Sequence, residues 1–226
     1  YLERGMFDVD PHSVAASLAA DERFDRNRVR EGGQRLRELI DWAFRTKRSI
    51  LVSGDTSSGK TKFLRAAAFA IPEADRVVTL EDTRELNLQH PNLVELVSNR
   101  DIGITLRTLV ATAMRLRPDR VVVGEVRGEE AYDLLAIMNT GHPCMATIHA
   151  NGAIDALARL ETLVMMSQTQ MPSEVIRRQL AATVSLVFHF SKYQGRRELR
   201  EIIEVSGYEG NKYQYQSLFR KEGISP

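Results

Sequence analysis

The sequence predicts an α/β fold with a mostly parallel sheet, because short apolar runs alternate with helical patterns from residue 49 onward. The runs lack alternating polar positions, which is typical of strands buried on both faces. They lie at residues 50–53, 77–80, 93–98, 121–124, 145–148 and 184–190. The helical patterns between them cover residues 60–71, 105–116, 129–139, 153–166 and 172–182. We therefore expect one sheet with helices on both faces.

Three stretches before this region carry local signals. Asp10 and Pro11 are a typical N-cap and first helical residue, which predicts a short helix there. Residues 21–35 are rich in charge, and we interpret them as a linker. Residues 36–44 place apolar side chains at i, i+3, i+4, i+7 and i+8, which predicts a helix that packs on the core.

The C-terminal tail has a different pattern. Residues 198–205 and 212–218 flank a turn with two glycines at 207–211, which predicts a β-hairpin at the edge of the fold. The arginine pairs at 177–178 and 196–197 are expected on a solvated surface.

The composition is typical of a folded globular protein, and the chain carries little net charge. Of 226 residues, 43% are hydrophobic and 27% are charged, which argues against wholesale disorder. With 31 basic and 30 acidic residues, the net charge of +1 gives no global electrostatic case for binding nucleic acid. The single cysteine, Cys144, excludes an internal disulfide and fits a reducing compartment.

Residues 53–64 read SGDTSSGKTKFL and contain a phosphate-binding motif. Gly54, Gly59, Lys60 and Thr61 satisfy G-x-x-x-x-G-K-[ST], between a predicted strand and a predicted helix. The backbone N–H groups of such a loop cradle phosphate, the lysine reaches the β- and γ-phosphates, and the threonine hydroxyl ligates Mg²⁺. A carboxylate facing the γ-phosphate would be costly, so we expect the side chain of Asp55 to point to solvent.

Acidic residues follow two of the predicted strands. VVTLEDTREL places Glu81, Asp82 and Glu85 after one strand, and RPDRVVVGEVRG places Glu125 after another. A single glutamate at a strand end is commonly a solvated turn residue. Because ligands of open α/β sheets bind at the carboxyl ends of the strands, both acidic groups should reach the crevice beside the phosphate loop.

His149 and several arginines are further candidates. His149 follows the run at 145–148, and the absence of a second His or Cys at zinc-ligand spacing argues against a zinc site. It could contact a γ-phosphate or link subunits through a hydrogen bond. Arg107 and Arg127 are candidates for phosphate contact, although their charge alone does not distinguish them from surface arginines.

Taken together, four segments resemble the traffic ATPases of type II and type IV secretion, conjugation and type IV pili, a RecA-like branch of the P-loop NTPases. The resemblance covers roughly residues 36–190. SGDTSSGKT resembles the Walker A loop, LEDTREL the Asp box, RLRPDRVVVGEVRG the Walker B segment with Glu in place of Asp, and TGHPCMATIHAN the His box. The Asp box and Walker B segments look closest to the conjugation and type IV secretion branch.

This resemblance implies a homohexameric ring, peripheral at the cytoplasmic face of the inner membrane, that hydrolyses ATP with Mg²⁺ and works with secretion or pilus subunits. It implies that Glu81 polarises the attacking water, with Glu85 as a second acidic candidate, and that Thr61 and, through water, Glu125 hold Mg²⁺. It also implies that His149 reads the γ-phosphate or relays the ATP state to a neighbouring subunit. Arg107 could neutralise charge in the transition state. The nucleotide-binding positions would be Gly54, Thr56, Ser57, Ser58, Gly59, Lys60 and Thr61.

The resemblance also sets the expected domains and the departures from the family. We expect a linker and the remnant of an N-terminal domain at residues 1–48, a RecA-like ATPase domain at 49–190 and a β-hairpin appendage at 191–226. The N-terminal domain of the family is longer than residues 1–48, so we expect the chain to bind nucleotide but to hydrolyse it poorly. Asp55, Ser57 and Cys144 stand where glycine is usual in the family.

Three alternative functions remain at this point. The chain could be a nucleotide-gated assembly scaffold with little hydrolysis, which the acidic Asp55 favours, or a motor of type II secretion or type IV pili. It could also be a RecA-like nucleic-acid motor. The balanced charge and the lack of interleaved aromatic and basic residues argue against nucleic acid as a direct ligand.

Overall fold

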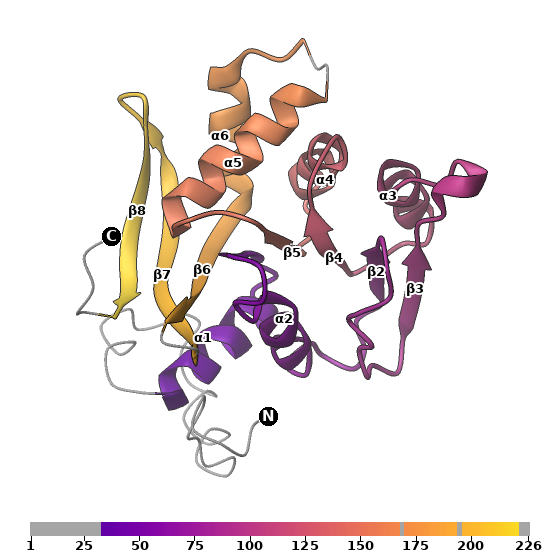
Figure 1. Ribbon diagram of the computed structural model, residues 1–226, viewed down its shortest axis with the longest axis horizontal. Coiled ribbons are helices and arrows are strands. Elements are labelled where there is room, and N and C mark those ends of the chain that lie inside the picture. The colour runs from indigo at the N-terminus through magenta and orange to yellow at the C-terminus, as the bar shows by residue number, and fades with distance from the viewer. Residues whose placement is uncertain (1–32, 168–169, 194–195, 222–226) are drawn as a thin grey trace.

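The computed structural model describes residues 33–167, 170–193 and 196–221, which build one eight-stranded sheet with helices on both faces (Figure 1). The strand order is β3-β2-β4-β5-β1-β6-β7-β8. The strands are β1 (Ser49–Gly54), β2 (Val77–Glu81), β3 (Leu93–Val97), β4 (Arg120–Val126), β5 (Cys144–Ile148), β6 (Val184–Tyr193), β7 (Arg196–Glu209) and β8 (Lys212–Arg220). The helices are α1 (Gly33–Arg45), α2 (Lys60–Ala68), α3 (Leu106–Arg115), α4 (Glu130–Asn139), α5 (Ala153–Met166) and α6 (Ser173–Thr183), with a 3₁₀ turn η2 (Arg100–Ile102).

Strands β1 to β6 pair in parallel, whereas β6, β7 and β8 pair antiparallel. Every residue of β1, β2 and β5 is buried, because helices cover both faces of the sheet at these strands. Strands with two covered faces need no polar alternation, which is why their sequences are continuous apolar runs. The predicted α/β fold with a mostly parallel sheet is confirmed.

The helices divide into two layers with separate hydrophobic cores. Helices α1 and α2 pack on one face of the sheet, and α3, α4, α5 and α6 pack on the other (Figure 1). In the α1–α2 layer, the ring of Phe63 lies 4.9 Å from those of both Phe188 and Phe190. These aromatic contacts fix α2, the helix that follows the phosphate loop, against β6.

Two helix boundaries differ from the sequence prediction. Helix α1 contains the predicted apolar stripe but begins at Gly33, so the linker predicted at 21–35 extends too far. The helix continues toward its N-terminus because burial of Leu36, Leu39 and Ile40 anchors its first turns. The helix predicted at 60–71 ends at Ala68, after which the chain closes with i→i+3 hydrogen bonds. The helix predicted at Asp10 lies outside the described residues.

The C-terminal hairpin is present and continues the main sheet, because β7 pairs with β6. Its strands are longer than predicted, and the turn consists of Gly210 and Asn211, both with positive φ (57° and 62°). Two such residues match a type I′ hairpin turn. Tyr208, predicted in the turn, lies in β7 opposite Tyr213, with ring centroids 5.4 Å apart.

Candidate functional site: a phosphate loop facing two glutamates

Two glycines shape the loop that leaves β1. Gly54 has φ +146°, and a Cβ there would lie 2.1 Å from the carbonyl oxygen of Phe190 on the neighbouring strand β6. Gly59 has φ +105° and precedes the first turn of α2. Both φ values lie in the region that favours glycine. The loop therefore passes tightly against β6 and then turns directly into a helix N-terminus.

Lys60, the first residue of α2, is held inside the loop. Its Nζ donates hydrogen bonds to the carbonyl oxygens of Gly54 (2.7 Å) and Asp55 (2.8 Å). Burial lowers the pKa of Lys60, and the nearby carboxylates of Glu125 and Asp55 partly oppose that shift. The first N–H groups of α2 have no carbonyl one turn earlier, so the helix dipole and this ammonium together favour an anion here.

Asp55 contributes its backbone to the loop and turns its side chain outward. The residue is exposed, and its carboxylate is not among the groups that line the cavity at the loop. The expectation that Asp55 points to solvent is confirmed. A carboxylate at this position therefore leaves the phosphate-facing side of the loop unchanged.

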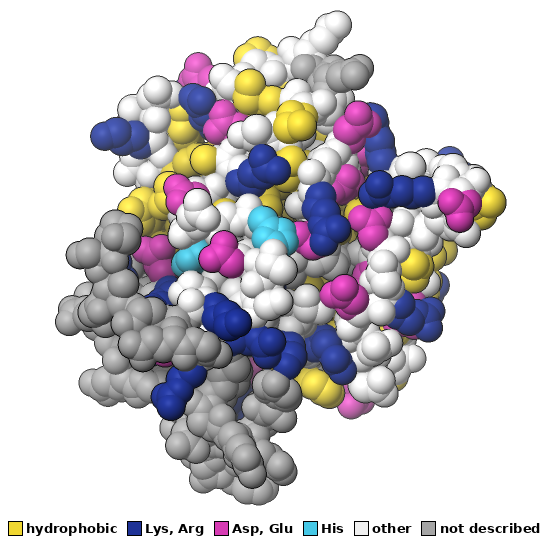
Figure 2. Space-filling view, viewed as in Figure 1, with side chains coloured by type: hydrophobic (Ala, Val, Ile, Leu, Met, Phe, Trp, Pro, Cys, Tyr) yellow, Lys and Arg dark blue, Asp and Glu magenta, His cyan; other side chains and the backbone are white. Residues whose placement is uncertain are grey.

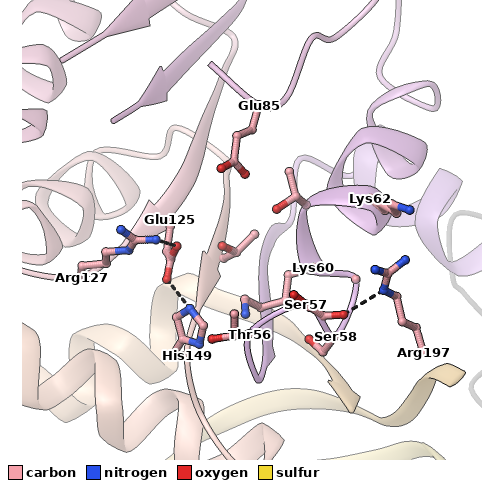
Figure 3. A pocket seen from close by; sticks show the side chains of 13 residues that line it. Thr56, Ser57, Ser58, Lys60, Lys62, Glu85, Glu125, Arg127, His149 and Arg197 are labelled. Carbon is pink, nitrogen blue, oxygen red and sulfur yellow. Dashed lines mark hydrogen bonds and ion pairs between the residues drawn. The ribbon is translucent and has the colours of Figure 1, made fainter. Parts of the chain in front are cut away.

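A cavity of about 320 Å³ opens in front of the loop (Figure 3). A second cavity of about 90 Å³ adjoins it and shares four lining residues with it, Thr61, Glu85, Glu125 and Arg127. The larger cavity is also lined by Thr56, Ser57, Ser58, Gly59, Lys60, Lys62, Thr147, His149 and Arg197. The smaller one is also lined by Glu81, Asp82, Thr83 and Gly124. The structure thus brings the loop and both predicted acidic segments together.

Glu125 lies in β4 and is bracketed by two basic side chains (Figure 3). Its Oε1 is 2.6 Å from Nε2 of His149, and its Oε2 forms an ion pair with Arg127. The hydrogen bond from Arg127 to Glu125 and the negative charge of the Glu125 carboxylate raise the pKa of Arg127. A carboxylate offers about four lone-pair sites, so both contacts leave acceptor capacity on Glu125.

Glu81 is almost fully buried, with 2% of its surface exposed. Its Oε1 accepts hydrogen bonds from the backbone N–H groups of Glu85 (3.0 Å) and Leu86 (2.8 Å). Its Oε2 is buried and has no hydrogen-bond partner within the described part of the chain. A buried carboxylate oxygen without a partner is costly, so this atom is suited to a ligand or a bound water.

Gly124 allows Glu81 to take this position. A Cβ on Gly124 would lie 3.1 Å from Cγ and 3.5 Å from Oε1 of Glu81. The bare backbone of β4 therefore forms one wall of the space that holds the Glu81 side chain. The adjacent residues Gly124 and Glu125 thus have different roles: Gly124 leaves room for the side chain of Glu81, and Glu125 contributes a second carboxylate to the site.

The residues predicted to hold Mg²⁺ fit that ion. Thr61 and Glu125 line both cavities, and Mg²⁺ is commonly bound by one or two carboxylates together with substrate phosphates and water. Among residues 33–167, 170–193 and 196–221, no group of three or more His, Cys, Asp or Glu side chains forms a metal site. The donors therefore suit an ion that arrives with a phosphate ligand.

Arg107 is not brought to the loop. Its guanidinium pairs with two acids next to and within α4, Glu129 (3.2 Å) and Asp133 (3.1 Å). It does not line either cavity at the loop. Arg127, the second arginine considered from the sequence, lines both cavities instead.

Thr147 and Arg197 also lie at the site, although Thr147 was not a candidate from the sequence and Arg197 was expected on a solvated surface. Thr147 in β5 is buried and donates from Oγ1 to the carbonyl oxygen of Gly124 (2.6 Å). Arg197 in β7 donates from Nε to the carbonyl oxygen of Ser57 (2.8 Å), across 140 positions of sequence. Thr147 follows from the register of the parallel strands, whereas no local signal marks Arg197 among the surface arginines.

The fold and the site together define the class. A glycine-rich loop after β1, at the carboxyl end of a parallel sheet and facing strand-end carboxylates, is the arrangement of P-loop nucleotide-binding proteins. Residues 27–192 match the family described as "Type II/IV secretion system protein", and the chain belongs to this family. The resemblance identified from the four sequence segments is thereby confirmed.

Relatives at the sequence level are named for conjugation. A Mycobacterium tuberculosis protein named for conjugal transfer is 44% identical over 169 residues, covering 72% of this chain and 47% of that protein. The conjugal transfer protein TrbB of Rhizobium radiobacter is 40% identical over 183 residues, covering 79% of this chain and 54% of the relative. The chain thus spans about half the length of these curated relatives.

A solved structure shares the fold. The crystal structure of the VirB11 ATPase from the Brucella suis type IV secretion system, in complex with sulphate, matches with a TM-score of 0.69 and 32% identity. The match covers 74% of this chain and 52% of that chain. No helix in the described part of the chain has the length and apolar character required to cross a bilayer.

Proposed function

We propose that this chain is the Mg²⁺-dependent ATP-hydrolysing part of a homohexameric ring that powers type IV secretion or conjugative transfer. The observation that carries the proposal is the convergence of Lys60, Glu125 and Glu81 on two adjoining cavities. The names of the relatives support the biological setting. The sulphate in the related Brucella suis structure is an anion that resembles phosphate.

The loop residues bind and orient the triphosphate. Lys60 and the N–H groups of the first turn of α2 hold the phosphates, together with the backbone and hydroxyls of Thr56, Ser57 and Ser58. Ser58 supports this role, because it lines the cavity and its buried Oγ has no partner among the described residues. Thr61, directly, and Glu125, through water, would hold Mg²⁺, which would supply positive charge against the phosphate oxygens.

Glu81 orients and polarises the attacking water. Two backbone N–H groups fix its Oε1, so the direction of its unpartnered Oε2 is set before substrate arrives. Such preorganisation lowers the cost of reaching the transition state. His149, whose Nε2 lies 2.6 Å from Oε1 of Glu125, is placed to report whether a γ-phosphate is present. Arg127 takes the charge-neutralising role first considered for Arg107, because Arg127, unlike Arg107, lines the cavity.

The proposed ring is peripheral at the cytoplasmic face of the inner membrane and contacts other subunits of the secretion machinery. The alternative function, a scaffold with little hydrolysis, ranks second. The acidic Asp55 favoured it from the sequence, but the carboxylate of Asp55 is exposed and does not obstruct the phosphate site. On the face drawn in Figure 2, acidic and basic side chains are intermixed, which does not favour a nucleic-acid backbone as ligand.

Separate substitutions Glu81→Gln and Glu125→Gln test the enzymatic part of the proposal. Phosphate release is measured under single-turnover conditions with excess protein, which resolves slow hydrolysis, and nucleotide binding is measured in parallel by calorimetry. We expect both variants to bind ATP and to lose at least about 100-fold in phosphate release. Glu174→Gln, at an exposed ion pair on α6, serves as the control. Unchanged release in both site variants contradicts the assignment.

The ring is tested by native mass spectrometry with and without Mg²⁺ and a non-hydrolysable ATP analogue. A hexamer that forms or becomes more abundant with nucleotide supports the proposal. A chain that stays monomeric at every concentration and with every nucleotide contradicts it.

A further inference from the structure

The C-terminal strand pair reaches back to the phosphate loop through one arginine. The Nε of Arg197 donates to the carbonyl oxygen of Ser57, a residue with φ of 61°, at 2.8 Å. The aliphatic stem of Arg197 covers Gly59, since a Cβ on that glycine would lie 3.2 Å from Cδ of Arg197. Arg197 also lines the larger cavity. Strand β7 therefore forms part of the wall of the nucleotide site.

Arg197 lies at one end of that cavity and the acidic residues lie at the other. Figure 3 shows Glu125 with its basic partners on one side of the loop and Arg197 on the opposite side. The smaller cavity, which holds Glu81 beside Glu125, is not lined by Arg197. Hydrolysis at Glu81 and Glu125 requires the γ-phosphate at their end, so the opposite end receives the part of the nucleotide nearest the base.

We propose that Arg197 binds the phosphate closest to the nucleoside, the one that ATP and ADP have in common, so that β7 senses an occupied site whichever nucleotide fills it. This inference rests on the proposed nucleotide binding. Of the three guanidinium nitrogens of Arg197, only Nε makes a hydrogen bond to a described residue. The planar guanidinium then offers its two terminal nitrogens to phosphate oxygens, a geometry that a lysine ammonium cannot reproduce.

The position predicts a pattern of affinities distinct from that of the residues at the acidic end. Loss of Arg197 should weaken ADP and ATP equally, because the contacted phosphate is present in both. Loss of His149, by contrast, should affect ATP more than ADP. A purely structural role for Arg197 in stiffening the loop would instead lower the melting temperature of the nucleotide-free chain.

Arg197→Met is the informative variant, because it keeps an unbranched apolar stem over Gly59 and removes the guanidinium. Arg196→Met is its matched control, since Arg196 is the adjacent strand residue, points to the opposite face and does not line the cavity. Arg197→Lys restores charge without the planar fork. Affinities for ADP and for a non-hydrolysable ATP analogue are measured by calorimetry, and melting temperatures are measured without nucleotide.

We expect Arg197→Met to bind both nucleotides about tenfold more weakly than the unsubstituted chain. Arg197→Lys should recover only part of this loss, and Arg196→Met should bind normally. Unchanged affinities in Arg197→Met, a loss confined to the ATP analogue, or a lower melting temperature without a loss of affinity would each overturn the inference while leaving the proposed function intact. An unsubstituted chain that binds neither nucleotide would instead overturn the proposed function itself.

Discussion

Gly124→Ala tests whether the position of Glu81 determines the rate of hydrolysis. The new methyl group would lie 3.1 Å from Cγ and 3.5 Å from Oε1 of Glu81, and 3.6 Å from the carbonyl oxygen of Leu80. The shortest of these distances is a few tenths of an ångström inside ordinary contact. Because Gly124 does not have a positive φ, the backbone of β4 accepts alanine, and the Glu81 side chain must move instead.

The size of the effect follows from that displacement. A misplacement of about 1 Å at a catalytic group can cost about 100-fold in rate, so a shift of a few tenths should reduce phosphate release roughly tenfold. Affinity for a non-hydrolysable ATP analogue should remain within about twofold, because Gly124 does not line the larger cavity in front of the phosphate loop. Overpacking should lower the free energy of unfolding by about 1 kcal/mol.

The assay combines single-turnover phosphate release, calorimetric binding and thermal unfolding. Gly207→Ala is the control, since it is also a strand glycine and its Cβ would have no neighbour within 4 Å. If Gly124→Ala hydrolyses ATP as fast as Gly207→Ala, the placement of Glu81 does not limit catalysis and the reasoning is refuted. A crystal structure of the variant with Glu81 unmoved would refute it equally.

Three further substitutions probe the loop, the core and the pH dependence. Gly54→Ala should abolish nucleotide binding, because its Cβ would meet the backbone oxygen of Phe190 at 2.1 Å; calorimetric binding near the native affinity would contradict this. Arg120→Met should lower the free energy of unfolding by about 3 kcal/mol in denaturant titrations, since Asp75 loses its buried partner, and a change below about 1 kcal/mol would contradict that. Burial lowers the pKa of His189 from its usual 6.5, so the unfolded chain binds more protons there and stability should fall as the pH drops below 6.5. His189→Gln should reduce that slope, and identical pH profiles for both chains would exclude His189 as the cause.

The sequence predicted the parts of the site that parallel-sheet geometry controls. Buried strands must be apolar along their whole length, and their carboxyl ends share one edge, so placing Glu81 and Glu125 near the loop required no knowledge of side-chain packing. The exposed orientation of Asp55 followed from the cost of placing a carboxylate against phosphate. These predictions rest on the apolar pattern of buried parallel strands and on the cost of burying charge. Both can be recognised in short stretches of sequence.

The remaining features depend on contacts that no local pattern encodes. Arg197 reaches Ser57 only because β7 pairs with β6 in a particular register. Arg107 looked equivalent to Arg127 in sequence, but the packing of α3 beside α4 gives it acidic partners away from the loop. The turn of the hairpin was placed too early because the cross-strand contact of Tyr208 becomes visible only once the strands are paired.

The most direct test of this account is the structure of the Glu81→Gln variant with Mg²⁺ and ATP, since slow hydrolysis should leave the nucleotide intact. We expect the triphosphate in the larger cavity, with Lys60 transferred from the loop carbonyls to the phosphates, and with Glu125 and residue 81 on the γ-phosphate side. A triphosphate bound elsewhere, or either acidic position remaining out of reach of the metal and of the attacking water, would contradict the central claim.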